Sequence, residues 1–146
     1  MKKRTGLAVL GIGVLIVLWA LFRPEKLFVN QKVNEGLPVG SATTAATASS
    51  MAPMALLTGQ FHKGAHDTSG MAGIFQLDDG KRVLRLTNFK TSNGPDVHVY
   101  LVAANDAADS ETVKKAGFLD LGSLKGNEGD QNYDVPKDAD LAKYRQ

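Results

Sequence analysis

Cysteine is absent from the 146-residue chain, and this absence excludes several kinds of protein. Without thiols the chain can form no disulfide, carry no lipid on cysteine and use no thiolate as a nucleophile or metal ligand. Histidine is scarce as well, with three residues. Any acid–base or ligand site must therefore draw on a small set of side chains.

A basic surface is also missing, although the formal net charge is +2. The first 35 residues hold six of the 17 basic and two of the 15 acidic residues. The rest of the chain therefore has 11 basic and 13 acidic side chains, and its net charge is −2. No basic stripe and no aromatic–basic motif occurs, so nucleic acid is excluded as a partner. Neither a G-x-S-x-G elbow nor a Walker motif is present, and we predict no catalytic residue.

The longest apolar run lies at the N-terminus and carries no charge from Gly6 to Phe22. Lys2, Lys3 and Arg4 precede it, and Arg23 follows it. A helix of ~17 residues rises ~25 Å, close to the ~30 Å thickness of a hydrocarbon core. The pattern predicts cytoplasmic residues 1–5, a single-pass signal anchor over 6–22 in the cell membrane, and an extracytoplasmic remainder.

Two other interpretations of this run are weaker. A cleavable signal peptide needs small residues before the cut, and the sequence from Leu18 to Phe22 offers no such site. A buried core helix is disfavoured, because the run is apolar all round and charged residues stand at both of its ends. The uncleaved anchor remains the preferred interpretation.

The rest of the chain divides at a low-complexity tract. Residues 23–54 form a membrane-proximal segment and an Ala/Thr/Ser-rich tether, "GSATTAATASS", and residues 55–146 form one domain. Turn signals at short intervals predict an all-β, jelly-roll-like β-sandwich with at most two short helices. The expected strands are 56–61, 73–77, 81–89, 97–102, one from 118 and one around 132–135; a helix begins at Asp109 or Ser110 and ends at Gly117, and a helical turn follows Pro136.

The stretch "NGPDVHVYL" (93–101) joins a turn to an alternating strand. The alternation places Asp96, His98 and Tyr100 on one face, with Arg85 on a neighbouring strand. A carboxylate beside an imidazole fixes its tautomer and raises its basicity, as in metal sites and acid–base pairs. The alternative is a structural polar cluster or a solvated sheet face.

Other candidate ligands are weaker. His62 and His66 have the i, i+4 spacing of two ligands on a helix, but Gly64 between them predicts a loop. Met54 and Met71 are soft enough for copper, although methionine usually fills gaps. We predict no metal site from these residues.

Several motifs together resemble the DM-thirteen domain family, which is labelled electron transfer. They are His66 with Ser69-Gly70, Leu84-Arg85-Leu86 before Phe89, Asn93-Gly94-Pro95-Asp96 with His98 and Tyr100, and Gln131-Asn132-Tyr133. The resemblance covers about Leu56 to Tyr144. Bacterial members are similar in layout, with a membrane segment, a tether and one extracytoplasmic domain.

The resemblance implies an all-β domain with a redox role, which in the family is linked to a cysteine in a late strand. This chain lacks that cysteine, and the family continues past the "DLAKY" segment. Either the sequence is a fragment that is incomplete at its C-terminal end, which we favour, or the protein is a degenerate member of the family. The residues implied to bind a cofactor, with haem or copper as candidates, are His98, His66, Asp96, Tyr100 and Tyr133.

The expected function is an accessory electron-transfer protein, held in the membrane by its N-terminal helix. Its redox partner or envelope protein is not named by the sequence. The alternative is a non-catalytic module that binds a component of the cell envelope.

Overall fold

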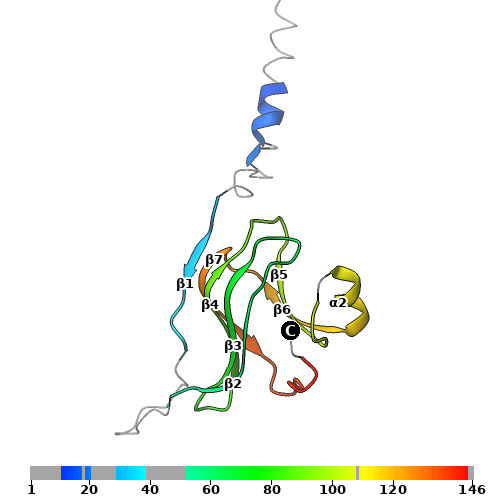
Figure 1. Ribbon diagram of the computed structural model, residues 1–146. Helices are drawn as coiled ribbons and strands as arrows, with labels where there is room; N and C mark the ends of the chain where they lie inside the picture. The colour runs from blue at the N-terminus through cyan, green and yellow to red at the C-terminus, as the bar shows by residue number, and fades with distance from the viewer. Residues whose placement is uncertain (1–10, 18, 21–28, 39–51, 108, 145–146) are drawn as a thin grey trace, which may run out of the picture. The chain divides into compact units, whose positions relative to one another are not determined.

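The computed structural model describes residues 11–17, 19–20, 29–38, 52–107 and 109–144. The chain divides into two compact units, Met1–Asn30 and Gln31–Gln146. The predicted basic N-terminus (1–5) and the Ala/Thr/Ser tract (40–50) lie outside the described residues. Within its described part, the second unit contains seven strands and one labelled helix (Figure 1).

In the first unit, residues 11–17 and 19–20 are helical and largely exposed. They belong to the predicted membrane span Gly6–Phe22, whose other residues lie outside the described part of the chain. Among the helices that the structure describes, none is long and apolar enough to cross a membrane. The transmembrane anchor therefore stays a prediction from the sequence.

Five strands form one sheet in the order β1-β7-β4-β3-β2 (Figure 1). The central strand β4 (Arg82–Lys90) pairs in antiparallel register with β3 (Ser69–Gln76) and with β7 (Glu128–Val135). The edges are β2 (Met54–Gln60), antiparallel to β3, and β1 (Lys32–Asn34), parallel to β7. Strands β1 and β2 follow each other in the chain but lie at opposite edges of this sheet.

The hairpin between β3 and β4 has the turn that its sequence predicts. The Leu77 N–H donates to the Lys81 carbonyl at 2.8 Å, and the Gly80 N–H donates to the Leu77 carbonyl at 2.9 Å. The Asp79 carboxylate accepts the Lys81 N–H at 3.0 Å. Gly80 has a φ of 76°, a left-handed conformation that glycine adopts without a Cβ clash. The Asp-Gly hairpin is confirmed.

A second sheet consists of β5 (His98–Val102) and β6 (Phe118–Ser123) in antiparallel register. Helix α2 (Ser110–Ala116) connects them. The Asp109 carboxylate accepts a backbone N–H of the first turn at 2.7 Å, which caps the helix, and Gly117 ends it with a φ of 87°. Both predicted helix boundaries are confirmed. In the segment 136–144, for which a helical turn is expected, the structure has two hydrogen-bonded turns.

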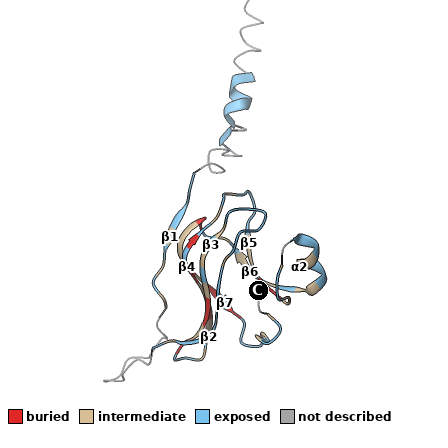
Figure 2. Ribbon diagram, in the orientation of Figure 1, coloured by how far each residue is buried: buried red, intermediate tan, exposed pale blue. Residues whose placement is uncertain are grey.

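The two sheets share one apolar core. Its buried members come from β3, β4, β5 and β7: Ile74, Leu84, Leu86, Phe89, Leu101, Tyr133 and Val135. Figure 2 shows the buried residues along β4 and β7. A fully buried apolar side chain of this size stabilises the fold by roughly 1.5–3 kcal/mol. The prediction of a mostly β protein with short helices is confirmed.

Strand β1 lies in a segment for which the sequence predicts no structure. Its three residues pair with Glu128, Gly129 and Asp130 of β7. Glycine is required at this contact, because a Cβ on Gly129 would collide with the backbone oxygen of Val33. In the sequence, the Ala/Thr/Ser tract, which lies outside the described residues, comes after β1 and before β2.

A pair of glycine substitutions isolates the contribution of β1. Gly129 and Gly122 both have a positive φ, 103° and 107°, but only a Cβ on Gly129 would meet another atom within 4 Å. Both Gly→Ala changes cost ~1 kcal/mol for the backbone conformation. We expect Gly129→Ala to lower the free energy of unfolding by a further ~1–2 kcal/mol in urea titrations, through loss of β1 pairing. Equal losses for the two variants would show that β1 adds no stability.

Candidate functional site

The outer face of the β5–β6 sheet carries two of the candidate residues, His98 and Tyr100. Across the sheet Tyr100 pairs with Asp120, so these two side chains share this face. The rings of Tyr100 and Phe118 lie 4.5 Å apart between centroids and are tilted by 41°. With Asp96, which precedes β5, these residues form what we call the outer-face cluster: Asp96, His98, Tyr100, Phe118 and Asp120.

His98 lies between two carboxylates. Its Nδ1–H donates to Asp120 Oδ2 at 3.0 Å, and its Nε2 lies 3.3 Å from Asp96 Oδ1. Ser123 Oγ lies 3.4 Å from the same Nε2. The Gly122 N–H donates to Asp120 at 2.8 Å and holds that carboxylate in place. Each ring nitrogen thus faces an acceptor, an arrangement that suits the protonated ring.

These contacts shift the titration of the cluster. The hydrogen bond to Asp120 raises the pKa of His98 above its usual value, and the charge of Asp96 acts in the same direction. The pKa of Asp120 is lowered, first by the Gly122 N–H and second by His98. The imidazole therefore holds its proton more tightly than a free histidine does.

Two carboxylates contact His98, and the sequence predicts one of them. Asp96, the predicted partner, faces Nε2 from an exposed position, while Asp120 contacts Nδ1 from β6. Tyr100 contacts His98 through its ring, with centroids 5.9 Å apart. The alternation in "FLDL" marks Asp120 as a polar-face residue, but only the pairing of β5 with β6 brings it to His98.

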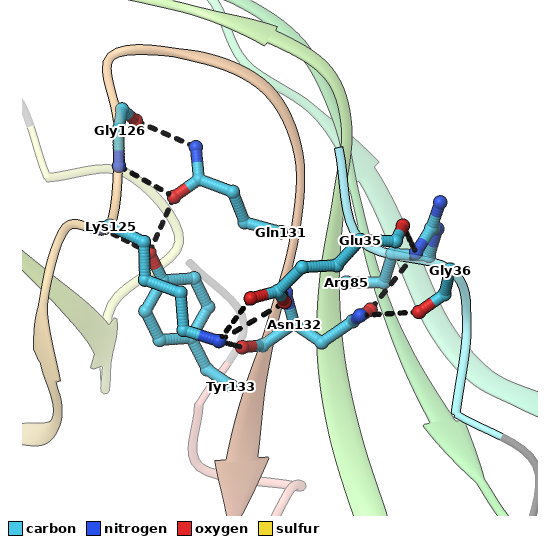
Figure 3. Close-up of polar contacts among 8 residues, drawn as sticks. All are labelled: Glu35, Gly36, Arg85, Lys125, Gly126, Gln131, Asn132 and Tyr133. Atoms are coloured by element: carbon cyan, nitrogen blue, oxygen red, sulfur yellow. Dashed lines mark hydrogen bonds and ion pairs between the residues drawn. The ribbon is translucent and has the colours of Figure 1, made fainter. Parts of the chain in front are cut away.

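Tyr133 belongs to a different, buried cluster (Figure 3). Its hydroxyl donates to Gln131 Oε1 at 2.7 Å and accepts the Lys125 N–H at 3.0 Å. Gln131, fully buried, also donates from Nε2 to the Gly126 carbonyl at 2.6 Å. Burial raises the pKa of Tyr133. The neutral Tyr133 hydroxyl both donates and accepts a hydrogen bond, and these bonds fix the turn before β7. The hydroxyl is therefore not free to bind a ligand.

Glu35 joins this buried cluster to the segment that follows β1 (Figure 3). Its carboxylate accepts from Lys125 Nζ and from the Asn132 N–H, each at 2.8 Å. Arg85 donates to the Glu35 carbonyl and to Asn132 Oδ1 at 3.0 Å, and to Asp130 Oδ2 at 2.7 Å. Burial raises the pKa of Glu35, but the bonds from Lys125 and Asn132 outweigh it, so that the pKa lies below its usual value.

The remaining candidates lie apart from His98. Arg85, expected on a strand beside it, is on β4, whose partners are β3 and β7. His66 is exposed in the loop between β2 and β3, where its carbonyl accepts the Gly64 N–H at 3.3 Å. His62 in the same loop has its Nε2 3.6 Å from Asp106. The expected loop between these two histidines is confirmed.

A haem or copper centre does not fit the candidate residues. Both nitrogens of His98 face carboxylates, and the hydroxyl of Tyr133 is engaged on both sides. In the described part of the chain, no three His, Cys, Asp or Glu side chains are grouped to hold a metal ion. A cavity of about 400 Å³ opens beside the core between β2, β3 and residues 141–144, but no histidine or methionine is among the described residues that line it.

Substituting the carboxylate that orients His98 tests the geometry of the cluster. Asp120→Asn keeps an acceptor for the Gly122 N–H but removes the charge that stabilises the imidazolium. We expect the pKa of His98 to fall toward its ordinary value, measured by NMR titration of the three histidines. Because the native pKa is raised, the pair stabilises the fold at low pH, and this stability is lost as the pH rises through that pKa.

Asp96→Asn is the matched control, since Asp96 is 85% exposed and its charge contributes less to the shift. A His98 pKa that stays unchanged in Asp120→Asn would contradict the assigned pairing.

Comparison with family models gives a match to one family, described as electron transfer DM13, over residues 60–146. The matched range includes β3 to β7 and every member of the outer-face cluster. Comparison with curated proteins finds no match, and comparison with solved structures finds none. The family match covers more than half of the sequence and confirms the resemblance seen in its motifs. The chain is a member of the electron transfer DM13 family.

Proposed function

We propose that the protein is a membrane-anchored, extracytoplasmic accessory component of electron transfer, with a jelly-roll-like β-sandwich as its working domain. The observation that carries this proposal is the match to the electron transfer DM13 family over residues 60–146. Membership of this family supports a role in electron transfer. The side chains of this chain indicate what kind of role it is.

The membrane location is supported by the N-terminal sequence. The uncharged run from Gly6 to Phe22 follows three basic residues, and positive charge at this end favours a cytoplasmic N-terminus. The domain that follows would then lie outside the cytoplasm, as a single-pass protein of the cell membrane.

An accessory role agrees with the chemistry of the side chains. The chain has no thiol, and the described histidines form no ligand set for haem or copper. The outer-face cluster instead exposes carboxylates and aromatic rings to solvent. In the proposed role, this exposed cluster binds a component that carries the electrons.

Deletion of the gene in the native host tests this function. We expect the rate at which intact cells reduce external ferricyanide to fall, because the accessory component is missing from the membrane. Expression of the full chain from a plasmid should restore the rate.

The matched control is a chain without residues 6–22, which should not restore the rate. Protease added to spheroplasts should remove the domain of the full chain. An unchanged ferricyanide rate in the deletion strain would contradict a role in electron transfer.

The second candidate is a non-catalytic module that binds an envelope component. It is favoured by the missing cysteine and by the exposed aromatic pair Tyr100 and Phe118. Cells that lose an envelope interaction but keep their full electron-transfer rate would identify this function.

A further inference from the structure

The outer-face cluster combines exposed aromatic rings with exposed carboxylates. Tyr100 and Phe118 are 38% and 44% exposed although their rings contact each other. The side chains of Asp96 and Asp120 are 85% and 43% exposed. Aromatic side chains exposed beside charged groups at the surface of a small domain are typical of interaction sites.

The charges of the cluster have one dominant sign. Two carboxylates face one imidazole, so the cluster is negative whether or not His98 carries its proton. The residues after position 35 have a net charge of −2, which adds to the same field. Carboxylates bind guanidinium and ammonium groups by charge-assisted hydrogen bonds, and the faces of aromatic rings attract the same cations.

We propose that the outer-face cluster is a docking surface for a segment of a partner protein that carries arginine or lysine. This inference rests on the proposed function and specifies the kind of partner that the protein binds in that function. A saccharide fits less well, because the rings of Tyr100 and Phe118 are tilted by 41° and form no single flat platform. The two carboxylates next to the rings supply the complementary charge.

The proton on His98 regulates this surface. The charged groups that face the ring are Asp96 from the turn before β5 and Asp120 from β6; its other neighbours, Tyr100 and Ser123, are neutral. The imidazolium cancels one negative charge, and loss of its proton frees both carboxylates. Docking of a cation therefore strengthens as the pH rises through the pKa of His98, which lies above the usual histidine value.

Binding of a labelled octa-arginine peptide to the full chain in lipid nanodiscs tests the proposal by fluorescence anisotropy. We expect Asp96→Asn and Phe118→Ala each to weaken binding about three- to tenfold, because each removes one exposed contact with the cation. Both side chains are exposed enough for the fold to persist, which unfolding curves check. The matched control is Asp138→Asn, an exposed carboxylate outside the cluster, which should leave the affinity unchanged.

Two outcomes would overturn the proposal. Equal affinity for the cluster variants and Asp138→Asn would show that the peptide binds the acidic surface without selecting this site. Weakening by Phe118→Ala alone, with no dependence on salt, would show that the peptide binds by apolar contact and that the carboxylates do not recognise its charge. These results are independent of the ferricyanide rate in the deletion strain, so failure of the docking surface and failure of the proposed function are distinguishable.

Discussion

The carboxylate of Glu35 connects three parts of the domain that are distant in sequence. It binds Lys125 in the turn before β7 and the backbone of Asn132 within β7, and it directly follows β1. Charge-assisted bonds contribute roughly 1.5–3 kcal/mol when sheltered, and less here because the Lys125 and Glu35 side chains are 42% and 33% exposed. The turn that Lys125 helps to fix leads from β6 into β7. Strand β6 carries two members of the outer-face cluster, Phe118 and Asp120.

The molecule separates polar groups that stabilise it from polar groups that are available to a partner. Among the described residues, no buried side-chain nitrogen or oxygen lacks a hydrogen bond. Tyr133 and Gln131 hydrogen-bond to each other and to the backbone of the turn before β7. These bonds favour one arrangement of the core, and the groups that make them are not available to a ligand. The aspartates around His98 are instead exposed at a sheet face. The proposed docking role therefore relies on the exposed polar groups and not on the buried ones.

Local sequence patterns predict the parts of this fold that depend on local chemistry. The Asp79-Gly80 turn, the capped helix α2 and the alternating strand β5 follow from residues a few positions apart. The pairing of β5 with β6 depends on contacts between distant segments, and for that reason Asp120 was missed as the partner of His98. Strand β1 was missed because three residues carry too little periodicity, and its edge position is set by glycines almost a hundred residues later.

The proposed docking role depends on the outer-face cluster. The most direct measurement is the ferricyanide reduction rate of native cells whose chromosomal gene carries both Tyr100→Ala and Phe118→Ala, with the abundance of the protein measured in the same cells. We expect the rate to fall to that of a strain without the protein, while the abundance stays at the level of the unmodified chain. A normal rate at normal abundance would contradict a docking role for this face.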